Sequence, residues 1–228
     1  MKHSVICDSG ALISLTSSCL DGLLYFFAEK HNVQFIIPPS VEYECITRPI
    51  ESNLRKYLFS AIRLKDAIDD GIIVRVNDQG TENDARELIK LSNSLFYVRG
   101  NPLQLIQSGE AQMLALSKEI GVDYVLIDER TARLLIESPM HLKEHLEQEF
   151  HVNVMVNKAN LRSITAAISP LKALRSSEIV MLAYEKGYFA NFNSLEKDAL
   201  EAALYKIKHA GCSISFDEIA NYIKSVTH

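Results

Sequence analysis

The chain has 228 residues, of which 47% are hydrophobic and 23% are charged, as in an ordinary globular protein. This composition excludes a disordered or collagen-like chain. The 29 acidic residues outnumber the 24 lysines and arginines, so the net charge of −5 supplies no global basic field for nucleic acid. Any contact with nucleic acid must therefore be local, or must use cations held between carboxylates.

The N-terminal residues are apolar, but Asp8 interrupts them too early for the core of a signal peptide. No window approaches the ~18 uninterrupted apolar residues that a membrane span needs. The four cysteines form no C-x-x-C pair, which favours reduced thiols in a chain of this length. We therefore expect a cytoplasmic protein without a membrane partner.

Short runs rich in β-branched residues alternate along the chain with longer segments of helical periodicity. Strands are predicted over residues 4–7, 33–40, 72–76, 122–128 and 152–156. Helices are predicted over residues 11–31 with a break near Asp21 and Gly22, from Val41 after a Ser40 cap, and over 53–71, 81–96 and 108–121. Further helices are predicted over residues 129–138, 173–189 and 195–211, with a last short one opened by residues 215–218.

Strands that alternate with helices of this length are typical of βαβ units and a parallel sheet. The sequence therefore predicts an α/β protein, a three-layer α/β/α sandwich around a central parallel sheet of about five strands. No strand pattern recurs after Lys158. We expect residues 1–160 to form this domain and residues 161–228 to form a C-terminal helical extension.

Four acids stand where such a fold places ligand sites. Asp8 follows a predicted strand and Asp128 ends another. Glu44 lies one turn into the helix after the second strand, and Glu110 lies in the first turn of another helix. The carboxyl ends of parallel strands share one edge of a sheet. The four carboxylates are therefore expected to converge there, although each acid alone also suits an ordinary helix cap or a first turn.

Clustered carboxylates repel one another unless some are protonated or a cation lies between them. Oxygen ligands without histidine or cysteine favour Mg²⁺ or Mn²⁺ over zinc. Such ions lower the pKa of bound water and hold the oxygens of a phosphodiester, which is nuclease chemistry.

Three stretches together resemble the PIN-domain family, in particular its prokaryotic branch: ICDSGALISL, VEYE after a strand and two prolines, and SGEAQMLALSKEIGVDYVLIDERTAR. The resemblance covers about residues 3–156. It implies a metal-dependent endoribonuclease that cuts single-stranded RNA, in many relatives as the toxin of a toxin–antitoxin pair with a protein antitoxin as partner.

The resemblance also assigns site residues. It implies that Asp8, Glu44, Glu110 and Asp128 are catalytic, with Asp8, Glu110 and Asp128 holding Mg²⁺ or Mn²⁺ directly. Ser9 matches a small polar residue beside the first acid, and Arg133 is a candidate phosphate contact whose alternative is a salt bridge. The chain departs from the family pattern at Glu129, at Asn157 and in the long stretch 92–107. The Asn157 departure and the C-terminal helical extension motivate a second hypothesis, a catalytically silent PIN-like protein-interaction module.

Three further features have competing interpretations. His141 to His145 fits the H-x-x-E-H zinc-protease pattern, but its charged surroundings favour a solvated helix. Lys56, Arg63 and Lys65 give either an RNA-facing stripe or an ordinary solvated face. The apolar face in residues 202–211 is expected to dock on the domain or to form a homodimer.

Overall fold

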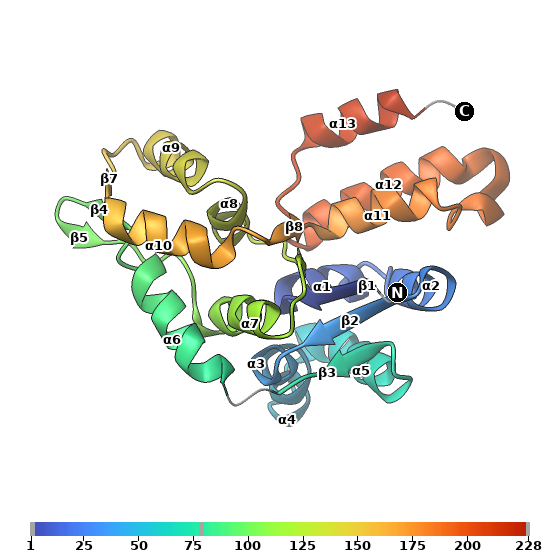
Figure 1. Cartoon of the computed structure of the whole chain (residues 1–228). Coiled ribbons are helices and arrows are strands. Elements are labelled where there is room, and N and C mark those ends of the chain that lie inside the picture. Colours follow the sequence, from blue (N-terminus) through green and yellow to red (C-terminus); the bar gives the residue numbers. More distant parts are fainter. Residues whose placement is uncertain (1–2, 78–79, 227–228) are drawn as a thin grey trace.

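The computed structural model describes residues 3–77 and 80–226, whose central sheet is entirely parallel (Figure 1). Within these ranges the strand order is β3-β2-β1-β6-β8. The strands are β1 (His3–Cys7), β2 (Val33–Ile37), β3 (Ile73–Arg75), β6 (Tyr124–Leu126) and β8 (Lys172–Leu174). The predicted α/β class with a five-stranded parallel sheet is confirmed.

Helices cover both faces of this sheet. One face carries α1 (Ser9–Ser17), α2 (Gly22–His31), α5 (Arg55–Asp69), α11 (Ser176–Glu185), α12 (Glu196–Ala210) and α13 (Phe216–Ser225). The other carries α6 (Thr81–Ser92), α7 (Ser108–Glu119), α8 (Arg130–Glu137), α9 (Pro139–Phe150) and α10 (Lys158–Ile168). Short elements α3 (Pro39–Glu42), π-helix η1 (Tyr43–Thr47), α4 (Arg48–Glu51) and 3₁₀-helix η2 (Ala190–Leu195) connect them.

The strands divide their side chains between the two faces. Val5 and Cys7 of β1 belong to the core beneath α1 and α12, whereas Ile6 between them belongs to the core beneath α7. Phe35 and Ile36 of β2 separate in the same way. Because successive residues of a strand point to opposite faces, these apolar runs bury both sides of the sheet. The three-layer α/β/α arrangement follows.

The strand predicted at residues 152–156 forms, but it does not join the central sheet. It is reduced to β7 (Met155–Val156), which pairs antiparallel with β4 (Phe96–Val98) in a small second sheet. The long stretch 92–107 supplies that partner as a hairpin, β4 and β5 (Asn101–Pro102). Arg99 and Gly100 between them both have positive φ, as tight hairpin turns require.

The fifth strand of the central sheet is instead β8, which corrects the prediction that residues 161–228 are purely helical. Lys172, Ala173 and Leu174 pair parallel with β6 along its full length. The helices that follow β8 share one hydrophobic core with β1: Leu200 of α12 and Ile219 of α13 are fully buried in it. The expected division at residue 160 therefore does not separate two cores.

One helix start differs from the prediction. Ser40 does not cap a helix, because α3 already begins at Pro39. The helix predicted from residue 81 does begin at Thr81, with Gly80 as its N-cap. The predicted break at Asp21 and Gly22 is confirmed, since α1 and α2 meet there at 107°.

In the described part of the chain no single helix is long and apolar enough to cross a membrane. Only the bent pair of α1 and α2 passes the same test of length and composition, and most of its large apolar side chains are buried in the core.

Candidate functional site

The two aspartates that follow strands lie at the same edge of the central sheet. β1 and β6 are direct neighbours, with Cys7 opposite Leu126 in their parallel register. The backbone N–H of Asp8 donates to the carbonyl of Leu126 at 2.9 Å. Asp128 follows β6 by two residues, so this part of the sequence prediction is met.

The Asp8 carboxylate caps helix α1 from a buried position. Its Oδ2 accepts a hydrogen bond from the Gly10 backbone N–H at 3.0 Å, and the residue is only 8% exposed. Burial first, and then the negative charges of Glu110 and Glu44, raise the pKa of Asp8 to about 7, although the Gly10 N–H opposes the shift. Three of the four predicted acids thus influence one another electrostatically.

Glu44 comes from the short helical segment that follows β2. It lies in η1, and single π-helical turns are frequent at functional sites. A Cβ placed on Gly109 would lie 3.6 Å from the Glu44 Oε2, so this carboxylate stands against the first turn of α7. Negative charge is favoured there by the helix dipole. Glu44 therefore lies against the helix turn that also contains Glu110.

Glu110 also has a structural task. Its Oε2 accepts a hydrogen bond from the Gln107 backbone N–H at 2.9 Å, completing the capping box of α7. Glu110 therefore caps a helix, which was the alternative role predicted for it. Its negative charge still contributes to the raised pKa of Asp8. One of its carboxylate oxygens takes no part in the cap.

Asp128 is the most deeply buried of the four acids and has a partner that the sequence did not reveal. Its Oδ1 accepts the Ser176 backbone N–H and its Oδ2 accepts the Ser176 hydroxyl, both at 2.7 Å. The carbonyl of Asp128 also accepts the Ser213 N–H at 3.3 Å. Asp128 therefore fastens the start of α11 and the segment before α13 to the sheet edge.

A cavity of about 730 Å³ opens at this edge, and Glu44 and Asp128 line it. Asp8 lies beneath its wall, hydrogen-bonded to the lining residue Gly10. Basic side chains line the cavity from two sides: Arg48 and Lys56 from α4 and α5, and Lys206, with the imidazole of His209, from α12. Of these side chains, the sequence pattern indicated only Lys56 as a candidate RNA contact.

The cavity also contains a buried hydroxyl without a partner. Ser18, at the end of α1, is 8% exposed and lines the cavity, and its Oγ makes no hydrogen bond. Buried polar atoms are nearly always hydrogen-bonded, so an orphan in a cavity wall is a position for a ligand atom or a water.

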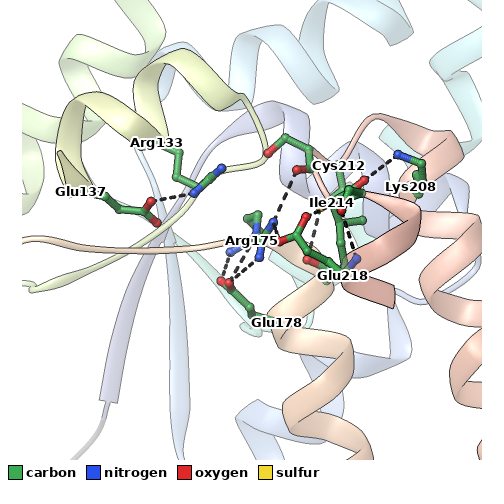
Figure 2. A network of polar contacts seen from close by, with 11 residues as sticks. Arg133, Glu137, Arg175, Glu178, Lys208, Cys212, Ile214 and Glu218 are labelled. Atoms are coloured by element: carbon green, nitrogen blue, oxygen red, sulfur yellow. Dashed lines mark hydrogen bonds and ion pairs between the residues drawn. The ribbon is translucent and has the colours of Figure 1, made fainter. Parts of the chain in front are cut away.

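The two predicted substrate contacts do not line this cavity. Ser9 is buried in the first turn of α1. Arg133 donates through Nη1 to Glu137 at 2.6 Å, the salt bridge that was its alternative, and its buried Nε is unpartnered (Figure 2). Glu129, one of the positions at which the chain departs from the family pattern, caps α8: its carboxylate accepts a hydrogen bond from the Ala132 backbone N–H.

A second arginine, Arg175, holds the C-terminal helices (Figure 2). Arg175 precedes Ser176 and is almost buried, with Nη2 donating to Glu178 at 3.0 Å and Nη1 donating to Glu218 at 2.9 Å. These bonds join α11 to α13. The sequence could not have paired Arg175 with Glu218, because 43 residues separate them.

No preassembled metal centre exists within residues 3–77 and 80–226: no three His, Cys, Asp or Glu side chains are grouped to hold an ion. The H-x-x-E-H segment forms no such group either. Its His141 and Glu144 are exposed on α9, as expected for a solvated helix. Likewise, Asp8, Glu110 and Asp128 do not form a closed ligand set as they stand.

Comparison with known proteins found no matching family model, no similar curated protein and no similar solved structure.

Proposed function

We propose that the chain is a PIN-like, divalent-metal-dependent endoribonuclease that hydrolyses phosphodiester bonds of single-stranded RNA. The observation that carries the proposal is the buried carboxylate of Asp8, held near Glu44 and Glu110 at the carboxyl edge of a parallel sheet. A cavity with cations on two sides opens at the same edge. Acids for a metal and cations for phosphates are the two components such an enzyme needs.

The donor chemistry of the acids fits a hard cation. The pKa of Asp8 is raised to about 7 because the charges of Glu110 and Glu44 add to the effect of burial, and a divalent ion would reverse that cost. Asp8, Glu110 and Asp128 would hold Mg²⁺ or Mn²⁺, with Glu44 beside them. When bound, the ion supplies a water of lowered pKa and stabilises charge on the phosphate oxygens.

The chain's own groups bind and orient the substrate. Arg48, Lys56 and Lys206 lie where they can pair with successive phosphates along the cavity. Glu44 is exposed at the cavity and lines it, so its carboxylate oxygens are placed to orient the attacking water.

A second candidate function is a catalytically silent PIN-like interaction module. The double hydrogen bond of Asp128 to Ser176 favours it, because both carboxylate oxygens already serve the packing of α11. The two functions differ in metal binding. A nuclease is expected to bind Mn²⁺ at the acids, which electron paramagnetic resonance measures directly, whereas the module is not.

The nuclease is tested on single-stranded RNA with Mg²⁺ or Mn²⁺, with EDTA, and with the variants Asp8→Asn and Asp84→Asn. Asp84 is an acid of α6 outside the cavity and serves as the matched control. We expect products with 5′-phosphate ends, no cleavage in EDTA, and at least a hundredfold loss in Asp8→Asn alone. Full activity of Asp8→Asn, or no cleavage by the wild type, would reject the proposal.

A role as the toxin of a cytoplasmic toxin–antitoxin pair remains a prediction within this proposal. It is tested by inducing the chain alone and together with the protein encoded by the adjacent reading frame. We expect growth arrest that Asp8→Asn abolishes and that the neighbouring protein relieves.

A further inference from the structure

A second cavity, of about 360 Å³, lies at the carboxyl ends of β2 and β3, between the start of α6 and the side of α7. Its size falls within the range of small-molecule sites. We name it the amide–hydroxyl pocket after its polar lining residues: Ser40, Tyr43, Asn77, Thr81 and Gln112. Apolar walls come from Pro38, Pro39, Val76 and Leu116.

Two buried hydroxyls of this pocket have no hydrogen-bond partner within residues 3–77 and 80–226. Thr81 is 6% exposed, and its Oγ1 makes no hydrogen bond; the Oγ of Ser40 is likewise buried and unpartnered. An unsatisfied buried polar group is destabilising, and most such groups in proteins find a partner. Two orphans in the wall of one pocket indicate that a ligand with hydrogen-bonding edges completes it.

The lining defines the class of that ligand. Among the described residues that line the pocket there is no lysine, arginine or histidine, and the one acid among them, Glu82, lies near Arg86. A phosphate therefore has no counter-charge there. The amides of Asn77 and Gln112 offer both donors and acceptors, and Tyr43 is 56% exposed. Neutral donors, neutral acceptors, apolar walls and an exposed aromatic ring match a flat, uncharged heterocycle.

Two elements connect this pocket to the acids. Tyr43 lines the amide–hydroxyl pocket while the next residue, Glu44, lines the larger cavity. Gln112 follows Glu110 by two residues on α7. An RNA strand whose phosphates lie along the larger cavity would thus find a polar pocket for one of its bases beside the acids.

We propose that the amide–hydroxyl pocket binds one unstacked nucleobase and gives the protein a base preference. Single-stranded RNA is commonly recognised in this way, by a splayed base that stacks on an aromatic ring and is hydrogen-bonded along its edge. The orphan hydroxyls and the Gln112 amide read that edge, and Tyr43 covers the ring. That the base belongs to an RNA substrate rests on the function proposed above; the pocket's affinity for a base does not.

The test uses the full chain in EDTA, so that no cleavage occurs. Adenosine, guanosine, cytidine and uridine are titrated separately by saturation-transfer NMR. Single-stranded RNAs that differ at one position are titrated by fluorescence anisotropy. The variants are Thr81→Val and Gln112→Leu, which remove the polar groups at nearly constant volume. Thr165→Val and Gln148→Leu, both at exposed sites on other helices, are the matched controls.

We expect one nucleoside to bind at least fivefold more tightly than the others. Each pocket variant should weaken it about tenfold, as for the loss of one hydrogen bond in a buried site, and the controls should stay within twofold. Equal affinity for all four nucleosides, or unchanged binding in both pocket variants, overturns the proposal. Because Thr81→Val removes an orphan hydroxyl, its thermal stability should not fall, so lost binding is not explained by unfolding.

The two proposals fail separately. If RNA is cleaved without base preference and Thr81→Val binds like the wild type, the nuclease stands and the pocket assignment is wrong. If no RNA is cleaved but a nucleoside binds and both pocket variants lose it, the pocket assignment stands and the nuclease is wrong.

Discussion

Asp128 and Ser176 are joined twice: the carboxylate accepts the backbone N–H at one oxygen and the hydroxyl at the other, each at 2.7 Å. Asp128 is 3% exposed and Ser176 is fully buried. The pair connects the edge of the sheet, where the candidate catalytic acids lie, to the first turn of α11. A residue 48 positions away along the chain thus orients one of the four acids.

Ser176→Ala removes the hydroxyl of this pair and leaves the Asp128 Oδ2 without that donor. A hydrogen bond to a buried charged group contributes about 1.5–3 kcal/mol, so the free energy of unfolding should fall by about that amount. Urea denaturation measures the loss. Ser163→Ala, at an exposed site on α10, is the control and should change stability by only a few tenths of a kcal/mol. An equal effect of both substitutions would contradict a structural role for the pair.

The raised pKa of Asp8 predicts a pH-dependent stability in the metal-free protein. Because burial and the charge of Glu110 raise this pKa from 3.8 to about 7, the folded state binds a proton that the unfolded state has released between these values. The contribution of Asp8 to stability is therefore complete below pH 4 and is lost as the pH rises through 7.

Asp8→Asn should remove that dependence, because the amide stays neutral and its oxygen can still accept the Gly10 N–H. In EDTA the variant and the wild type should be equally stable at pH 4, and the variant more stable by about 4 kcal/mol at pH 8. Urea melts at the two pH values measure the difference. A constant difference between the two proteins across this range would show that Asp8 titrates normally.

The glycines at the second position of α1 and of α7 are a matched pair for testing the geometry of the acids. A Cβ on Gly10 would lie 3.0 Å from the Asp8 Oδ2 that caps the helix, whereas one on Gly109 would lie at an ordinary 3.6 Å from the Glu44 Oε2. Gly109→Ala should stabilise the protein by about 0.5–1 kcal/mol through the lower entropy of the unfolded chain. In Gly10→Ala the new Cβ displaces the Asp8 carboxylate that caps the helix. This variant should therefore be less stable than the wild type by about 1 kcal/mol. Thermal melts of both variants separate the two cases.

The sequence predicted those parts of the site that depend on strand ends. Asp8 and Asp128 follow apolar runs with a strong β pattern, and parallel strands bring their ends to one edge. Ser176 was missed because nothing local distinguishes a buried hydroxyl that binds a distant carboxylate from an ordinary helix start. The basic side of the cavity formed by Lys206 and His209 was missed for a related reason: helical periodicity does not reveal which helix packs against α1.

The fold was predicted least well where strands are short. β8 has three residues, too few to show a period, and it forms because β6 offers it a parallel edge. The strand predicted at residues 152–156 does form, but periodicity does not reveal which strand it pairs with. It pairs with β4 of the β4–β5 hairpin, in a second sheet.

The cations around the larger cavity give the last prediction. Lys56 on α5 and Lys206 on α12 line it from different elements, and each is exposed. If each contacts one phosphate, Lys56→Met and Lys206→Met should each weaken RNA binding several-fold. Each should also reduce the slope of log affinity against log salt concentration by about 0.7, the value for one contact to a single strand. Lys90→Met, at an exposed site on α6, should change neither quantity. Anisotropy titrations in EDTA at several salt concentrations measure both. An unchanged salt slope in both cavity variants would show that the RNA backbone does not pass between α5 and α12, whatever the acids beneath it do.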